Sequence, residues 1–183
     1  MKDKLTRIDV EITLASGGSL EGESMSELDL SGVDFQKASL RGCDLRYSIM
    51  IHVILEVSDL SGANIGGAVL SESNLTGAFF RKSDLRWSIL LGVTAVGADF
   101  SDAGFLESRL SFSNFTNANF SRSDLRRSDL TDAIFVASDF SEANMARVDL
   151  RHSDITRAIF QNANMLGLKL PENTSISFCD DSD

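Results

Sequence analysis

The residues of this chain best suited to chemistry are two histidines, two cysteines and an excess of acidic side chains. Paired carboxylates for general acid/base work would need a pocket and unlike environments. Here the aspartates recur one per short repeat, which indicates a structural requirement, because their carboxylates can cap backbone N–H groups at a corner. Cys43 occupies a position otherwise taken by Ala or Ser, which predicts a buried, inert thiol. Cys179 lies in the tail, where it is available to oxidise or to link chains.

Bulk properties set the class of protein. The 183 residues suffice for one domain with a sizeable core, and the net charge of −10 disfavours direct nucleic-acid binding, which needs a basic footprint. The first residues carry charges throughout and resemble no secretory signal, and no apolar run approaches the ~20 residues that span a bilayer. We expect no membrane partner and a reducing, cytoplasmic location.

The apolar residues follow a period of five. Every fifth residue from Leu20 to Leu170 gives 31 positions, of which 15 are Leu, 9 Phe, 4 Met and 2 Ile, with Ala95 the exception. The residue two places earlier is Ala at 11 positions and Ser at 11 more, and the residue between them is Asp or Asn at 17. A helix or a flat strand would show a period of 3.6 or 2. A unit of five with one small and one large inward residue instead fits a coil that turns a corner in every unit.

Units such as GADFS (97–101), NANFS (117–121), RSDLR (122–126) and EANMA (142–146) resemble those of the pentapeptide-repeat proteins. The resemblance covers residues 20–170 without a break in phase. It implies an all-β fold, a right-handed quadrilateral β-helix (solenoid) of about eight coils with four repeats each. At ~4.8 Å per coil the rod is ~37 Å long.

The 20-residue coil implied by this resemblance turns the sequence into columns. Five phenylalanines at positions 80, 100, 120, 140 and 160 should stack in one interior pile. His52 and His152 fall five coils apart, ~24 Å along the rod, so they cannot share a metal or a proton relay. We predict no catalytic residues, no metal site and no cofactor, and therefore no enzyme.

The ends of the chain depart from the repeat. We expect residues 1–19 to form an N-terminal strand or cap segment, with 8–14 as a strand, residues 20–170 to form the β-helix, and 171–183 to form an acidic tail. Ile176 and Phe178 could fold over the last coil. Gyrase-binding members of the family often dimerise through a C-terminal helical extension, which this sequence lacks.

Outward-facing apolar residues cluster in adjacent columns. The cluster comprises Tyr47, Ile49, Ile51, Val69, Trp87, Ile89 and Leu91. A contiguous apolar patch often marks an interface, whereas a stripe of β-branched residues is also favoured on a sheet for its own sake. Both interpretations stay open on sequence alone.

Charge is uneven along the repeat. Residues 20–79 carry nine acids and three bases, whereas residues 80–170 carry eleven of each. The nine acids form a candidate acidic face: Glu21, Glu23, Glu27, Asp29, Asp34, Asp44, Glu56, Asp59 and Glu72. Arginines that follow an Asp-Leu pair, at 46, 86, 126 and 151, are expected to neutralise acids on neighbouring coils.

Two functions fit these features. The first is a protein-interaction scaffold that binds through the apolar patch, with a second copy of the chain or another protein as partner. The second comes from the family resemblance, since some members mimic B-DNA and bind type II topoisomerases such as DNA gyrase, which they inhibit or protect. A duplex of ~37 Å carries about 22 phosphate charges at one per ~1.7 Å, so this rod would be a dilute mimic.

Overall fold

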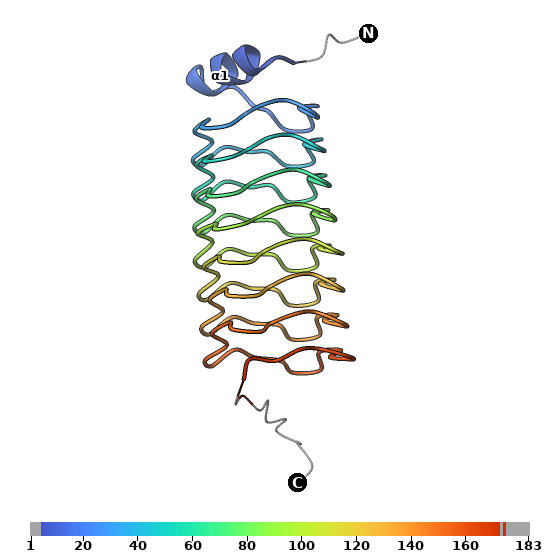
Figure 1. Ribbon diagram of the computed structural model, residues 1–183. Helices are drawn as coiled ribbons and strands as arrows, with labels where there is room; N and C mark the ends of the chain where they lie inside the picture. Colours follow the sequence, from blue (N-terminus) through green and yellow to red (C-terminus); the bar gives the residue numbers. More distant parts are fainter. Residues whose placement is uncertain (1–4, 173, 175–183) are drawn as a thin grey trace.

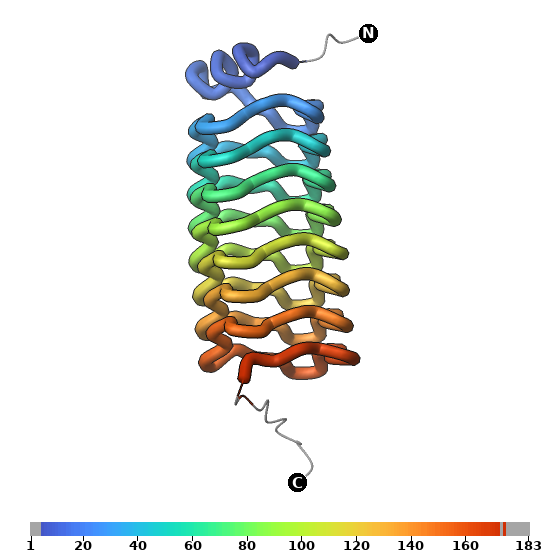
Figure 2. The backbone as a smooth tube through the Cα atoms, viewed as in Figure 1, coloured from blue at the N-terminus to red at the C-terminus, as the bar shows by residue number. Residues whose placement is uncertain are grey.

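The computed structural model describes residues 5–172 and 174, which form a rod of stacked coils with a helix lying across one end (Figure 1). The helix, α1, spans Arg7–Ala15. The tube in Figure 2 follows the chain as it winds from the helix to the opposite end of the rod. In the described part of the chain the coils pair through isolated parallel bridges rather than through extended strands.

The coil returns to the same column after 20 residues. Between Ser24 and Lys169 every fifth residue bridges in parallel to the residue 20 positions further on, which gives four columns of bridges. The Leu70 N–H donates to the Ile89 carbonyl oxygen (2.7 Å), and the Ile89 N–H donates to that of Ala68 (2.9 Å). Backbone donors and acceptors on each side of the coil are thus satisfied by the neighbouring coils.

Each corner is a tight turn. In most units the N–H three places after the large core residue donates back to its carbonyl oxygen, as from Ala68 to Ile65 at 3.0 Å. The residue two places after the core residue has a positive φ in every unit from Gly22 to Gly167. This matches a type II β-turn, whose third residue requires that conformation.

The repeated Asp and Asn side chains cap these turns, as the sequence predicts. Each of the 17 accepts, through Oδ1, a hydrogen bond from the backbone N–H two residues further on; in Asp29 the donor is Ser31, at 3.0 Å. The short side chain holds the first turn residue in place and leaves the following residue free for the positive φ.

The predicted pile of phenylalanines is confirmed. Successive ring centroids from Phe80 to Phe160 lie 4.9 to 5.2 Å apart, and all four pairs are stacked. Phe115 and Phe135 stack in the neighbouring column at 5.2 Å and meet the first pile edge-on. In these two runs each phenylalanine therefore packs against a phenylalanine of an adjacent coil.

Buried serines at the small inward positions are all hydrogen-bonded, because a hydroxyl in the core needs an acceptor. Ser48 donates to the Leu45 carbonyl oxygen of its own turn (2.7 Å). Ser73 instead donates to the Met50 carbonyl oxygen of the preceding coil (2.8 Å) and accepts the Val53 N–H (3.1 Å). Ser113 and Ser153, which lie two and four coils after Ser73, make the same pair of bonds.

The expected strand over residues 8–14 is wrong, because this segment is the helix α1. Thr6 and Asp9 form a capping box at its start, and Ser16 caps its end. Val10 is fully buried, and Leu5 and Leu14 pack against the core. The apolar residues that alternate in the sequence divide between two helix faces, and the inner face covers the first coil.

Phe120 offers a direct test of the interior pile, since five other phenylalanine ring centroids lie within 6.0 Å of its own. Phe120→Ala should lower the free energy of unfolding by about 3–5 kcal/mol, measured by chemical denaturation. Phe120→Leu retains most of the volume and should lose clearly less. Equal losses in the two variants would contradict a close-packed pile.

Val57 tests the backbone of the corner, because this β-branched residue has a φ of 57° and a half-exposed side chain. Left-handed backbone costs a residue with a Cβ roughly 1–2 kcal/mol, and Asn tolerates it better. Val57→Asn should therefore raise the melting temperature. Val96→Asn is the matched control. Val96 lies one place after its core residue instead of two, its φ is not positive, and its replacement by Asn should give no such gain.

Candidate functional site: an apolar face of the rod

One side of the rod carries the apolar cluster expected from the sequence. Ile49, Val69 and Ile89 bridge in succession along the centre of this side, so they lie in three consecutive coils. The corner before them carries Tyr47 and Trp87, which are 61% and 51% exposed, and the corner after them carries Ile51 and Leu91. We call these seven residues the Val69 face: Tyr47, Ile49, Ile51, Val69, Trp87, Ile89 and Leu91.

The aromatic corner of the Val69 face depends on Gly67. A Cβ added to Gly67 would lie 2.6 Å from both Cδ1 and Cε1 of Tyr47, so the tyrosine ring lies flat across the glycine of the next coil. Trp87, one coil further on, has the Arg86 guanidinium carbon 5.3 Å from its ring centroid. Gly67 thus leaves room for the ring of Tyr47, the only tyrosine of the chain, between its own coil and the coil of Trp87, the only tryptophan.

The nine acids of the first coils surround the rod instead of forming one face. Asp29, Asp34, Asp44 and Asp59 belong to four different bridge columns. Arg41 pairs with both Glu21 (3.2 Å) and Asp59 (2.9 Å). The acidic charge of this end is thus spread around all sides and partly neutralised.

The arginines that follow Asp-Leu do not reach neighbouring coils, so that prediction is wrong. Arg46, Arg86, Arg126 and Arg151 each bind the aspartate two residues earlier through two guanidinium nitrogens, at 2.6 to 2.9 Å. The reason is geometric: both side chains project from the same side of one corner. The ion pair holds the pKa of Asp84 below its usual range, as it does for Asp124.

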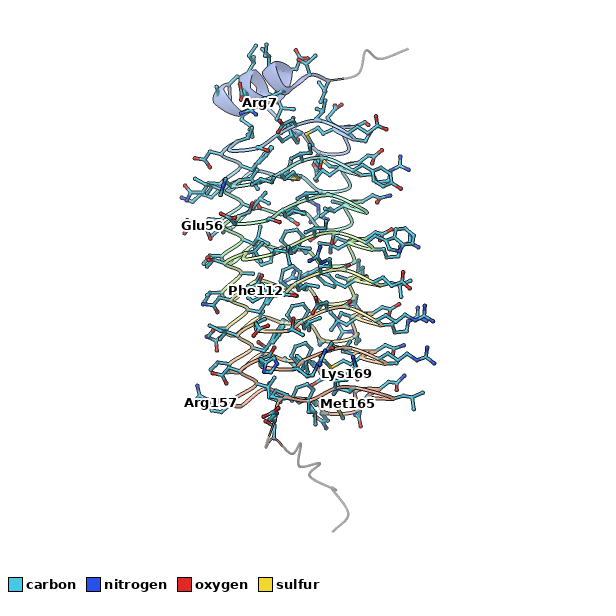
Figure 3. The ribbon with its side chains drawn as sticks, viewed as in Figure 1. Arg7, Glu56, Phe112, Arg157, Met165 and Lys169 are labelled. Carbon is cyan, nitrogen blue, oxygen red and sulfur yellow. The ribbon has the colours of Figure 1, made fainter. Side chains whose placement is uncertain are left out.

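Neighbouring coils are joined by other charged pairs. Arg122 binds Asp102 at 2.8 Å, Arg127 binds Glu107 at 3.0 Å, and Lys169 binds Asp149 at 3.0 Å. Figure 3 shows Lys169 in the last part of the rod, with Met165 nearby and Arg7 on the helix at the other end. These bridges link positions 20 apart and are half exposed, so each contributes little alone.

The residues that could support catalysis remain separate. Burial raises the pKa of the Cys43 thiol to about 11, and its Sγ–H donates to the Leu20 carbonyl oxygen at 2.9 Å, so the thiol stays protonated. His52 lies near Glu72 on the surface, with its Nδ1 3.7 Å from a carboxylate oxygen. Residues 5–172 and 174 contain no group of three His, Cys, Asp or Glu side chains that could hold a metal ion. Cys179, Ile176 and Phe178 lie outside the described residues.

The surface has an open hollow of about 480 Å³ on another side of the rod. Both of its arginines are already paired: Asp59 binds Arg41, and Asp99 binds Arg81, whose guanidinium lies over the Phe79 ring. The hollow is lined by Arg41, Asp59, Ser61, Gly62, Phe79, Arg81 and Lys82.

Two surface features escaped the sequence interpretation. Ile8 and Ile12 are 65% and 62% exposed on the outer face of α1, which the expected strand concealed. The bidentate Asp–Arg pairs at 44–46, 84–86 and 124–126 recur every second coil of one bridge column. The sequence shows this repeat as Asp-Leu-Arg, but it does not show that each arginine binds the aspartate of its own unit.

Comparison with known proteins identifies the same five-residue repeat as the structure. The family profile described as pentapeptide repeats matches in eight copies, over residues 16–46, 24–62, 54–92, 96–132 and 133–167. No curated protein matches the sequence at a significant level. No helix among the described residues is both long and apolar enough to cross a membrane.

Two solved structures are similar in fold. HetL, a pentapeptide repeat protein involved in heterocyst differentiation regulation from the cyanobacterium Nostoc, has a TM-score of 0.62 and 18% identity, covering 94% of this chain and 100% of HetL. QnrB1, a plasmid-mediated fluoroquinolone resistance protein, has a TM-score of 0.56 and 22% identity, covering 83% of this chain and 90% of QnrB1.

Gly67→Ala tests the seat of Tyr47. The new Cβ would meet the ring at 2.6 Å, so the ring must leave its position, and a positive φ of 68° adds roughly 1–2 kcal/mol of strain. Gly77→Ala is the matched control, since its φ is 64° and its Cβ would meet Val57 at an ordinary 3.6 Å. We expect similar strain in both variants, but displaced NMR signals of the tyrosine ring only in Gly67→Ala. Unchanged ring signals in Gly67→Ala would contradict the contact.

Proposed function

The chain belongs to the pentapeptide-repeat family, and from this premise we propose that it is a non-catalytic scaffold that binds a protein partner through the Val69 face. The observation that carries the proposal is the alignment of seven apolar side chains over consecutive coils of one side. A contiguous apolar patch rimmed by polar residues is typical of an interaction site, and aromatic residues dominate the energetics of such sites.

The rod suits this role because its surface is preorganised. Tyr47 is already seated on Gly67, and the backbone beneath the patch is bonded on both sides to neighbouring coils. This chain would therefore lose little conformational entropy when a partner binds. We further infer that the coil is right-handed and quadrilateral, as the family resemblance implies, and that the protein acts in the cytoplasm.

A second candidate function is binding to a type II topoisomerase in place of DNA. The observation that favours it is the excess of acids in residues 20–79, nine against three bases, spread around the rod as phosphates are around a duplex. Against it stand the ion pairs that neutralise Glu21, Asp44 and Asp59. The chain shares its fold with QnrB1, a fluoroquinolone resistance protein, and this motivates a test of topoisomerase binding. Sequence identity of 22% supports the shared fold alone.

The scaffold function predicts that Tyr47→Ser combined with Trp87→Ser abolishes partner capture. We expect the wild type, immobilised and exposed to extract of its native host, to retain a defined partner that the double variant loses. Ile134→Ser, at a similarly exposed apolar position in another bridge column, is the control and should retain it. A partner retained equally by all three proteins would overturn the assignment of the face.

The two functions separate in a gyrase supercoiling assay. Binding in place of DNA predicts inhibition, or protection against a quinolone, that weakens with salt and with Asn or Gln at the acids of residues 21–72. The scaffold function predicts no effect of the protein in this assay, with or without the acidic residues.

A further inference from the structure

The Val69 face has an internal symmetry that a chance apolar stripe would lack. Its central bridge column reads Asp29, Ile49, Val69, Ile89 and Arg109 in consecutive coils. One coil from Val69 on either side the residue is an isoleucine, Ile49 or Ile89. Two coils away the residues carry opposite charges, Asp29 on one side and Arg109 on the other. The corner columns follow the same order: Tyr47 and Trp87 flank Gly67, and Ile51 and Leu91 flank Ser71.

We propose that this face is the contact surface between two copies of the chain, packed antiparallel about a two-fold axis at Val69. This inference rests on the proposed function and names the partner. A two-fold axis perpendicular to the rod brings each residue opposite the one at the same distance on the other side of Val69. Val69 then meets itself, Ile49 meets Ile89, and Tyr47 meets Trp87. Asp29 of each copy meets Arg109 of the other, so the interface closes with two ion pairs.

The charges select the antiparallel arrangement over the parallel one. In a parallel dimer each coil would meet its own copy, so Asp29 would face Asp29 and Arg109 would face Arg109, which costs free energy at both ends. Both side chains are exposed, and Arg109 makes no ion pair within residues 5–172. The hydrogen bonds from Ser31 hold the pKa of Asp29 below its usual value, and Arg7 of α1, which forms its ion pair with Glu11, adds a weaker attraction.

One pair of the symmetric set is unfavourable and is partly relieved. Glu27 and Glu107 occupy the outermost positions of the aromatic corner and would face each other as like charges. Glu107, however, is already bound to Arg127 at 3.0 Å, which brings a positive charge to the same place.

The size of the face sets the expected strength. From Asp29 to Arg109 is four coil steps, ~19 Å, so the interface lies at the low end of stable interfaces. We therefore expect a dimer that forms in the micromolar range and weakens as salt screens its end pairs.

The decisive experiment exchanges the charges and measures mass by sedimentation equilibrium, from micromolar to millimolar chain. Asp29→Arg and Arg109→Asp should each weaken self-association by roughly tenfold or more, because each places like charges at both ends. An equimolar mixture of the two variants should recover a dimer, since every end pair is then opposite in charge. The double variant carrying both changes should also dimerise.

Matched controls exclude effects on folding. Asp34→Arg changes an exposed aspartate of the same coil that makes the same cap but lies in another bridge column, and it should dimerise like the wild type. Position 29 can accept a basic side chain, since Arg109 and Lys169 occupy the same column. Circular dichroism melts should show all variants folded. In a Cys179→Ser background, Val69→Cys should cross-link to itself through a short bismaleimide, and Asn74→Cys should not.

The outcomes distinguish this inference from the proposed function. A wild type that stays monomeric throughout overturns the dimer, whereas the scaffold function survives if host extract still yields a partner lost by the Tyr47 and Trp87 variant. A wild-type dimer whose single-charge variants do not recover in the mixture overturns the antiparallel register. If neither a dimer nor a partner depends on the Val69 face, both fail together.

Discussion

The structure depends on close packing between identical positions of successive coils. Because the interior is narrow, each large side chain has its principal neighbours 20 residues before and after it, as the rings of Phe100, Phe120 and Phe140 show. A shift of one residue would place an aspartate in this pile and a phenylalanine in water. The packing therefore fixes the register of every coil, and the register in turn fixes which surface residues become neighbours.

This constraint also explains how the chain supports so many left-handed residues. Twenty-one residues other than glycine have a positive φ in the part of the chain that the structure describes, and each would disfavour the turn in isolation. Two interactions support the corners throughout the rod, the core residue before each corner and the backbone bonds to adjacent coils, and 17 units add the Asp or Asn cap. Left-handed conformations persist where the surrounding structure over-determines them, so the strain is distributed along the rod and is not the mark of a single site.

The sequence predicts well the features that repeat and poorly those that do not. The phenylalanine pile and the aspartate caps follow from a period read over many units, so local errors average out. The helix α1 occurs once, and its alternating Ile8, Val10 and Ile12 fit a strand as well as a helix. The capping box at Thr6 and Asp9 was the available signal for the helix. Arg86 shows a different limit: its column is predictable, but whether it binds along or across the coils depends on side-chain direction at the corner.

The Val69 face shows what a solenoid allows a surface to do. The core demands one large residue in five, but the bridge position before it is less restricted: it carries a capping Asp or Asn in 17 units and an isoleucine at Ile49. At such a position the fold alone does not determine the side chain. The side chain of Ile49 cannot accept the backbone hydrogen bond that Asp29 accepts in the same column. The apolar run from Ile49 to Ile89 therefore lacks three caps that would stabilise the turns. The fold beneath does not require this run of three losses bounded by opposite charges, and the proposed contact with a second copy would account for it.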